Sequence, residues 1–275
     1  METKKEHSFE TRENVGVLTR YFKREFSWST VRKPLSLVIA VFIWHLLTTY
    51  EVPFFEQVPK PLEVFKDAIK FVPTETYWTH VIYSNTRVLS GFIIAIATGV
   101  SLGLLMGYRK VFQDWTFPVF EVLRPVPPIA WLPISVIMFP TTEMSVTYLV
   151  FIGAFFPIVL NTLLGVRTVG ENYTRAALSL GASRGYIFRR IILPGATPSI
   201  FVGMLVGAGM TWEMVVAAEM IAGGYGLGYM TWDAYVVIAY PRIILGMISI
   251  GICGAILSGI VRLIGNRIMP WRQLF

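Results

Sequence analysis

The sequence predicts an all-α membrane protein with six transmembrane helices. Of its 275 residues, 54% are hydrophobic and only 15% are charged, whereas a soluble domain usually carries about 25% charged residues. Mean hydropathy is +0.59. A chain this apolar has too little polar surface to face water, which excludes a soluble domain, a disordered chain and a fibrous protein. The single cysteine, Cys253, has no partner for an internal disulfide, which excludes a disulfide scaffold.

Six apolar stretches are long enough, or nearly so, to cross a bilayer, which takes about 20 mostly apolar residues. Because hydrocarbon does not tolerate unpaired backbone groups, we expect these stretches to be helices. The third stretch differs from the others because it contains five prolines and two charged residues. The six stretches are residues 34–50, 88–108, 115–139, 144–166, 192–221 and 243–261.

Lysine and arginine residues concentrate on one side of the six stretches. The first 33 residues carry eight of them, and the loops after the second and fourth stretches and the C-terminal tail are also basic. The loop after the third stretch has none, and the loop after the fifth has only Arg242. Because cytoplasmic loops are enriched in these residues, we expect both termini in the cytoplasm. The net charge of +7 is then explained by membrane topology, and we predict no nucleic-acid partner.

The chain divides into a basic N-terminal segment, residues 1–33, and one membrane domain, residues 34–275. Residues 17–33 mix basic and aromatic side chains, which is typical of a helix lying on the inner leaflet; a disordered basic tail is the alternative. Between the first two stretches, Pro61 is placed to begin a helix. The apolar residues that follow it at helical spacing predict a short amphipathic helix on the outer surface.

The sequence carries no catalytic or metal-binding motif that we recognise. A phosphate-binding loop of the form G-x-x-x-x-G-K-S/T is absent. The three histidines, His7, His45 and His80, are far apart and lack the spacing of metal ligands. We therefore predict no catalytic residue, no metal site and no cofactor bound by this chain.

The longest inner loop, residues 167–197, has the pattern of a helix, a turn and a second helix. Gly181 is suited to end the first helix, because glycine accepts the left-handed conformation found there. Ser183 is suited to cap the second helix. Pro194 and Pro198 are expected to break the helix before the fifth stretch. A protruding hairpin with an apolar tip fits a groove on a cytoplasmic partner; an ordinary amphipathic connector is the alternative.

The motif R-A-A-x-x-x-G-A-S in this loop, with Phe188 and then Leu193-Pro194, resembles the EAA loop of ABC importer permeases. In that family the loop forms the coupling helices that dock on the ATPase subunit, so the resemblance implies a coupling segment over about residues 171–198. Arg175 stands where the family usually has Glu, which removes or reverses any salt bridge from this position to the ATPase. The implied coupling residues are Arg175, Ala176, Ala177, Gly181, Ala182, Ser183, Arg184, Phe188 and Pro194.

Two further stretches resemble the nitrate, sulfonate, taurine and bicarbonate branch of these permeases. One is R-P-V-P-P-I-A-W-L-P at residues 124–133, and the other is W-E-M-V-V-A-A-E-M-I at residues 212–221, followed by G-L-G at 226–228. The resemblance covers about residues 55–272. It implies the type I importer (MetI-like) fold in the inner membrane and a homodimer within membrane lipid. It also implies ATPase subunits that hold ATP and Mg, and an extracytoplasmic substrate-binding protein.

Ionisable residues inside the stretches are candidate pathway residues, because charges at membrane depth are costly and usually functional. Arg124 would attract an anion; the alternatives are that it snorkels to the inner interface or pairs with Glu121. Glu213 and Glu219 do not share a helix face, so we expect different roles, in a gate or in structural pairing. Arg87 is either interfacial or a partner for such an acid. The candidate pathway or gate residues are Arg124, Trp131, Pro133, Glu213 and Glu219.

Glycines indicate two other features. The glycine-rich run at residues 223–228 allows a tight outer loop, which is either a re-entrant gate or a flexible connection. Small residues four apart in the second and sixth stretches permit close helix packing, within the chain or across a homodimer. These residues are Gly99, Gly103 and Gly107, and Gly251, Ala255 and Gly259.

The sequence therefore predicts the permease subunit of an ATP-driven importer that carries a small anion of the taurine or sulfonate, nitrate or bicarbonate class into the cytoplasm. The chain itself is expected to do no covalent chemistry. An ATP-independent secondary transporter or channel is the alternative. Secondary transporters often contain inverted repeats, and we find none in this sequence.

Overall fold

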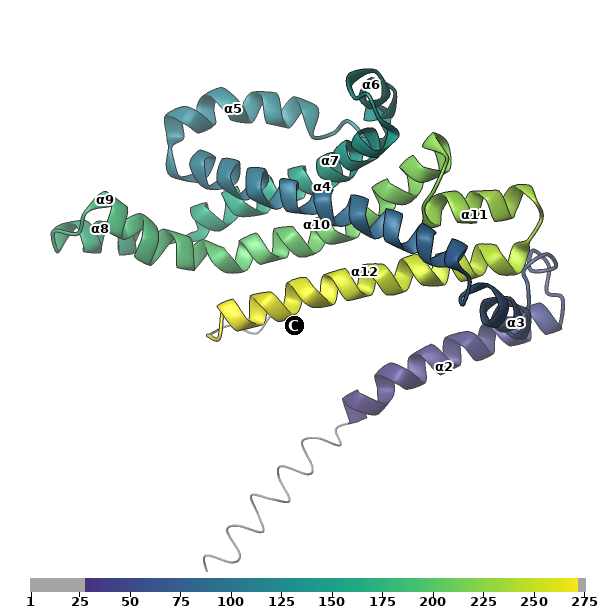
Figure 1. The fold of residues 1–275 in the computed structure, drawn as a ribbon. Helices are drawn as coiled ribbons and strands as arrows, with labels where there is room; N and C mark the ends of the chain where they lie inside the picture. Colours follow the sequence, from purple (N-terminus) through teal and green to yellow (C-terminus); the bar gives the residue numbers. More distant parts are fainter. Residues whose placement is uncertain (1–27, 272–275) are drawn as a thin grey trace, which may run out of the picture. The chain divides into compact units, whose positions relative to one another are not determined.

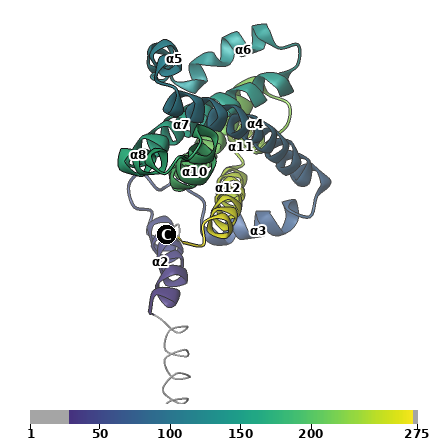
Figure 2. The same cartoon turned by 90° about the vertical axis from the view of Figure 1, so that its left-hand side faces the viewer.

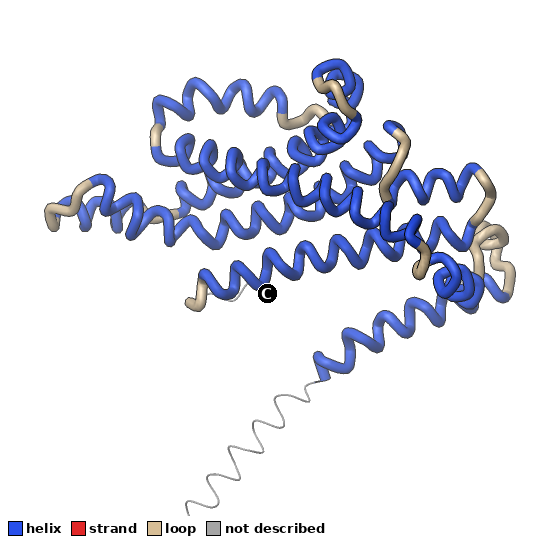
Figure 3. The backbone as a smooth tube through the Cα atoms, viewed as in Figure 1, coloured by secondary structure: helices blue, strands red, loops and turns tan. Residues whose placement is uncertain are grey.

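The computed structural model describes residues 28–271. All regular structure within this range is helical, with no β-strand (Figure 3). The chain divides into two compact units between Lys66 and Asp67, and each unit is described by itself. Most of the predicted inner-leaflet segment, residues 17–33, lies outside the described residues.

The N-terminal unit contains α2 (Trp28–Thr49), which covers most of the first predicted stretch. Its apolar part, Pro34–Thr49, is shorter than a typical membrane span. The chain then leads into α3 (Pro61–Phe71), which begins at Pro61 as predicted. The Lys60 N–H donates to the Glu63 carboxylate over 3.1 Å. This contact satisfies a backbone group that the helix itself leaves unpaired.

Four helices of the second unit are long and apolar enough to cross a membrane (Figure 1). They confirm helices at the second, fourth, fifth and sixth stretches. The second is longer than predicted, because Thr74 caps it by accepting from the Tyr77 N–H over 3.4 Å. The polar residues before position 88 therefore belong to the helix. The four are α4 (Glu75–Tyr108), α7 (Thr142–Thr168), α10 (Leu193–Ala222) and α12 (Tyr240–Ile268).

The third predicted stretch is a bent pair of helices. α5 (Lys110–Leu123) ends directly before Arg124, and a 3-10 turn, η1 (Pro128–Trp131), leads into α6 (Leu132–Met138). The two parts are bent by 93°. Prolines in the connection lack the N–H that a continuous helix would use, which accounts for the break. Within residues 28–271, five spans meet the length and apolarity of a membrane crossing if the bent pair is one of them.

α7 packs against both α4 and α10 at the centre of the second unit (Figure 2). Glycine makes this close approach feasible: a Cβ atom on Gly103 of α4 would lie 2.6 Å from the Cβ atom of Thr162 on α7. The glycines of the second stretch thus serve packing within this chain. In the sixth stretch the situation differs, because Cβ atoms on Gly251 and Gly259 would meet nothing within 4 Å.

The short helix α11 (Leu227–Val236) contacts α4, α10 and α12. Polar contacts fix the beginning of α12. The Arg242 guanidinium pairs with Asp67 over 3.3 Å and lies 4.1 Å from the centre of the Phe71 ring. Farther along, the hydroxyl groups of Tyr77 on α4 and Ser249 on α12 are hydrogen-bonded over 2.9 Å.

We expect Gly103→Ala to destabilise the chain. The added methyl group would overlap Thr162 and force α4 away from α7, and overpacking of this kind typically costs about 1–3 kcal/mol. The measurement is the thermal unfolding midpoint of the purified protein in detergent. Gly259→Ala is the matched control, because its methyl group enters open space. Equal midpoints for the two variants would contradict the packing described here.

Candidate functional site

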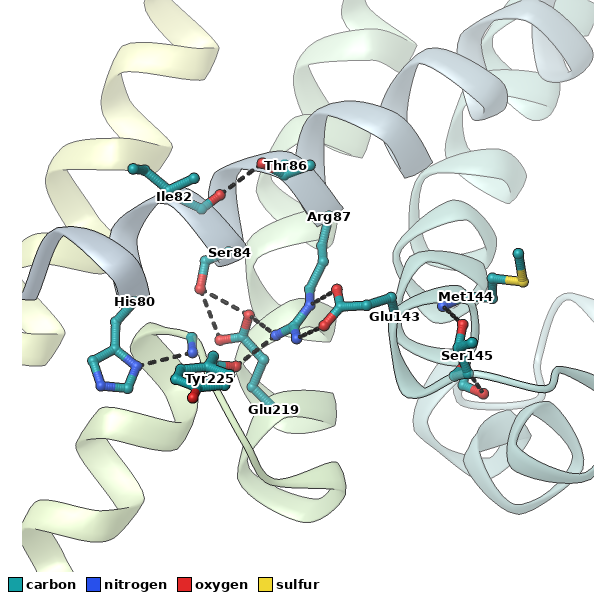
Figure 4. A network of polar contacts seen from close by, with 12 residues as sticks. His80, Ile82, Ser84, Thr86, Arg87, Glu143, Met144, Ser145, Glu219 and Tyr225 are labelled. Carbon is teal, nitrogen blue, oxygen red and sulfur yellow. Dashed lines mark hydrogen bonds and ion pairs between the residues drawn. The ribbon is translucent and has the colours of Figure 1, made fainter. Parts of the chain in front are cut away.

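Two polar regions lie at opposite ends of α10, and Figure 1 shows the course of this helix between them. At the beginning of α10 lies the segment predicted to couple to a partner, which we call the docking segment, residues 171–192. It consists of α8 (Glu171–Ser179), α9 (Arg184–Ile187) and a π-helical turn, η2 (Phe188–Ile192). At the end of α10 lies a buried cluster of charged side chains (Figure 4).

The turn of the docking segment has the predicted backbone conformation and helix cap. Gly181 follows α8 with φ of +80°, a backbone conformation that disfavours other residues. Ser183 caps α9, since its hydroxyl oxygen accepts from the Tyr186 N–H over 3.3 Å. Both predictions are confirmed.

The prediction that Pro194 and Pro198 break the helix is wrong. The helix continues from Arg184 through the π-helical turn to Ala222. Pro194 lies directly after the π-helical turn, where the regular hydrogen-bond pattern of the α-helix is already interrupted. Pro198 removes one donor from a helix that is otherwise continuous. α9, η2 and α10 therefore form one continuous helix.

The docking segment exposes apolar side chains next to basic ones. Leu180, at its tip, is 88% exposed. Arg175 pairs with Glu171 one helical turn earlier over 2.9 Å, and both side chains are exposed. Of the other predicted residues, Phe188 contacts the Tyr108 ring of α4 with 5.1 Å between ring centres. A hollow of about 370 Å³ opens between this segment and the end of α4; its lining is Tyr108, Arg109, Thr174, Leu178, Arg184 and Ile187.

Glu219 of α10 is the centre of the buried polar cluster. Its side chain is completely buried. The Ser84 hydroxyl of α4 lies 2.8 Å from each carboxylate oxygen, and the Gly228 N–H of α11 donates to Oε2 over 2.9 Å. Arg87 of α4 supplies the opposite charge, with Nη1 2.8 Å from Oε1. A buried carboxylate needs such compensation in charge and hydrogen bonds, and here two helices, α4 and α11, provide it.

Arg87 is itself held from several sides (Figure 4). Its side chain is only 3% exposed. Besides Glu219, it forms a two-pronged contact with Glu143 at the beginning of α7, in which Nε donates over 2.7 Å and Nη2 binds the other oxygen. Nη1 also donates to the Tyr225 carbonyl over 2.7 Å. One guanidinium group thus joins α4, α7, α10 and the loop before α11.

The glycine-rich loop at residues 223–228 is fixed by this cluster. The Gly226 N–H donates to Nδ1 of His80 over 3.0 Å, and the Leu227 N–H donates to the Ser84 hydroxyl over 2.8 Å. Gly226 has φ of +129°, and a Cβ atom there would collide with the Glu219 carboxylate. The backbone of residues 225–228 is thus hydrogen-bonded to side chains of the cluster.

The structure separates the predicted pathway residues. Glu219 has the structural pairing that was one of the predicted alternatives, with Arg87 as its partner, whereas Glu213 is exposed on α10. Arg124 is exposed at the end of α5, and within the described range it forms no ion pair with Glu121. In the bent connection Trp131 is half-buried and Pro133 on α6 is exposed. None of these exposed residues joins the buried cluster.

Sequence reasoning missed Ser84, Glu143 and the role of His80 in this cluster. A signal was available for the residues of α4: His80, Ser84 and Arg87 follow one another at steps of four and three, which puts them on one helix face. A polar face in an apolar helix indicates polar partners. Glu143 gives no such signal, because its pairing with Arg87 depends on how α7 packs against α4.

We expect Glu219→Leu to destabilise the chain strongly. It would leave the buried Arg87 without its buried counter-charge, and breaking a buried ion pair costs about 3–5 kcal/mol. Glu143→Gln is the control and should lose up to about 1 kcal/mol, because that carboxylate is half exposed. Thermal unfolding in detergent measures both losses.

The double variant Arg87→Leu with Glu219→Leu tests the same ion pair by removing both of its charges. It should be more stable than Glu219→Leu alone, because neither charge is then left buried without a partner. A double variant whose loss equals the sum of the two single losses would show that the two residues do not interact.

Comparison with known proteins identifies the family. Residues 95–272 match the family described as the binding-protein-dependent transport system inner membrane component. The chain is 38% identical to a putative ABC transporter permease protein of Methanocaldococcus jannaschii, over 86% of this chain and 90% of that one. It is 32% identical to the nitrate import permease protein of Synechocystis sp. (90% and 92% covered) and 33% identical to the taurine transport system permease protein of Escherichia coli (94% and 98% covered). The chain therefore belongs to this family and is a multi-pass inner-membrane permease of the ABC importer class, in the branch that includes the nitrate and taurine permeases.

Proposed function

We propose that this permease carries a small anion of the nitrate, taurine or sulfonate, or bicarbonate class into the cytoplasm, driven by a separate ATPase. In this proposal two copies of the chain form a homodimer, each with six spans and cytoplasmic termini. ATP and Mg are bound by the ATPase, and an extracytoplasmic binding protein delivers the solute. The relatives named for nitrate and taurine import support the solute class.

The observation that carries the proposal is the shape and surface of the docking segment. Two short helices meet near Gly181, and the segment exposes four large apolar or aromatic side chains, Tyr173, Leu178, Leu180 and Tyr186. Exposed apolar side chains gathered on one segment are typical of an interaction surface. Basic residues flank these side chains. We assign contact with the ATPase to this segment and to the first turn of α10. The contact residues would be Arg175, Ala176, Ala177, Gly181, Ala182, Ser183, Arg184, Phe188 and Pro194.

The continuous helix from α9 into α10 supports a mechanism for coupling. Movement of the docking segment, when the ATPase pair closes and opens, would move α10 along with it. The far end of α10 is bound to α4, α7 and α11 through Glu219 and Arg87. A displacement at the ATPase would therefore reach several helices at the opposite end of α10 together.

The bent connection after α5 supports a place for the solute pathway. Broken helices at membrane depth are tolerated where they line a cavity or are buried in protein. Arg124 is exposed at this break and carries the charge that an anion requires. We assign the pathway or gate to Arg124, Trp131, Pro133 and Glu213, and a gate-supporting role to the buried Glu219.

We expect Leu180→Asp to abolish binding of the ATPase. The charge would enter an apolar contact, whereas the permease itself should lose no more than about 0.5 kcal/mol, because the side chain is exposed. The measurement is co-purification of an ATPase with the tagged chain from native membranes in mild detergent. Val237→Asp is the control, since Val237 is also an exposed apolar residue but lies after α11. Retention of the ATPase by Leu180→Asp, or absence of any ATPase with the unaltered chain, would contradict the proposal.

We expect Arg124→Ala to lower anion uptake at least tenfold without loss of complex assembly, because the solute would lose its positive contact in the pathway. The measurement is uptake by the reconstituted complex, with nitrate and taurine as probes. Arg124→Lys should retain part of the uptake, because it keeps the positive charge. Arg262→Ala on α12 is the control for removal of one exposed arginine. Normal uptake kinetics in Arg124→Ala would remove this residue from the pathway.

A further inference from the structure

Glu213 is an exposed carboxylate in the second half of α10, a helix long and apolar enough to span a membrane. It lies nine residues before the end of α10 at Ala222. At 1.5 Å per residue this is about 14 Å along the helix, roughly half the thickness of the hydrocarbon core. A charge at this depth that faced lipid would be strongly unfavourable. The side chain must therefore face a more polar environment than lipid.

The neighbours of Glu213 show which face of α10 it occupies. Met214 faces α7, where its Cγ atom lies 2.7 Å from the place of a Cβ atom on Gly153. Trp212 faces α12, 3.4 Å from the place of a Cβ atom on Gly254. Glu213 points between these two contacts, on the face that it shares with the exposed Gly209 one turn earlier.

The two carboxylates of α10 differ in their partners: Glu219 is paired within the chain, and Glu213 is not. Glu219 is neutralised by Arg87 and receives hydrogen bonds from Ser84 and Gly228. For Glu213 no ion pair or hydrogen bond is present within residues 28–271. A fixed, uncompensated negative charge repels anions and attracts cationic groups.

We propose that Glu213 lines the solute pathway and selects a solute that carries a positively charged group. The solute class would then be a small zwitterion with an ammonium group and an anionic group, such as an aminosulfonate, in preference to a simple anion. This inference rests on the proposed import function. In it Glu213 receives the ammonium group, a role that Glu219 cannot fill because Arg87 already occupies it.

The test is solute uptake by the complete transporter in proteoliposomes, with its ATPase and binding protein. Taurine, which carries an ammonium and a sulfonate group, and nitrate, which has no cationic group, are the probes. We expect taurine uptake by the unaltered transporter, at least a fivefold loss in Glu213→Gln, and partial retention in Glu213→Asp. Nitrate uptake should be absent, or should rise in Glu213→Gln. Asp114→Asn removes an exposed carboxylate from α5 instead and is the matched control.

The outcomes separate the two proposals. Taurine uptake that is unchanged in Glu213→Gln, or uptake of nitrate alone, would overturn the role of Glu213 while leaving anion import intact. Uptake of neither probe would overturn the proposed solute class, and this inference with it.

A second measurement does not depend on transport. In a Cys253→Ser background, Glu213→Cys should react with the membrane-impermeant reagent sulfonatoethyl methanethiosulfonate, because the position faces water. Ala208→Cys is the control on the same helix, where the side chain is fully buried. Equal lack of reaction at both positions, in a complex that still retains its ATPase, would show that Glu213 does not line the pathway.

Discussion

Arg87 and Glu219 carry opposite charges at a place where neither has access to water. The guanidinium is 3% exposed and the carboxylate is not exposed at all. Each charge is stable there only because the other lies 2.8 Å away and because hydroxyl, carbonyl and backbone N–H groups complete their hydrogen bonds. The positions of α4, α7, α10 and α11 at this end of the unit follow from that requirement. A shift of any one of them would leave a buried polar group unsatisfied.

The same requirement explains the glycine-rich loop. Three successive backbone N–H groups, at residues 226–228, bind three side chains of the cluster. The loop must pass directly over the Glu219 carboxylate, and only a residue without a side chain fits at Gly226. Hydrogen bonds to the cluster thus determine the path of the loop, and they fix the position at which α11 begins. α10 links this rigid end to the docking segment, which ends in a π-helical turn directly before α10.

Local features of this chain were predictable from sequence, and contacts between distant residues were not. The four long helices follow from apolar stretches, and the turn at Gly181 and Ser183 follows from residue types that act within one helix end. The bend after α5 follows from prolines beside Arg124. Pro194 and Pro198 misled the prediction because the effect of a proline depends on its place within the helix. The pairing of Arg87 with Glu143 depends on the packing of α4 against α7, which Gly103 permits but does not specify. The candidates Arg124 and Glu213 were identified only as charges at membrane depth, and the sequence held no information on which charge would be neutralised.

Neutralisation is what distinguishes the two acids of α10. They lie six residues apart, or about 9 Å along the helix, and they point to different faces. At position 219 the neighbouring helices supply a cation, two hydrogen-bond donors and complete exclusion of water, so that the carboxylate serves to hold the structure together. At position 213 the neighbouring helices leave the carboxylate open. A membrane protein gains no stability from a charge that its own fold does not pair, so the partner of Glu213 must come from outside the chain: water, a second copy, or the solute. Of these three partners, only a solute with a cationic group would make the unpaired charge of Glu213 a means of selecting the solute.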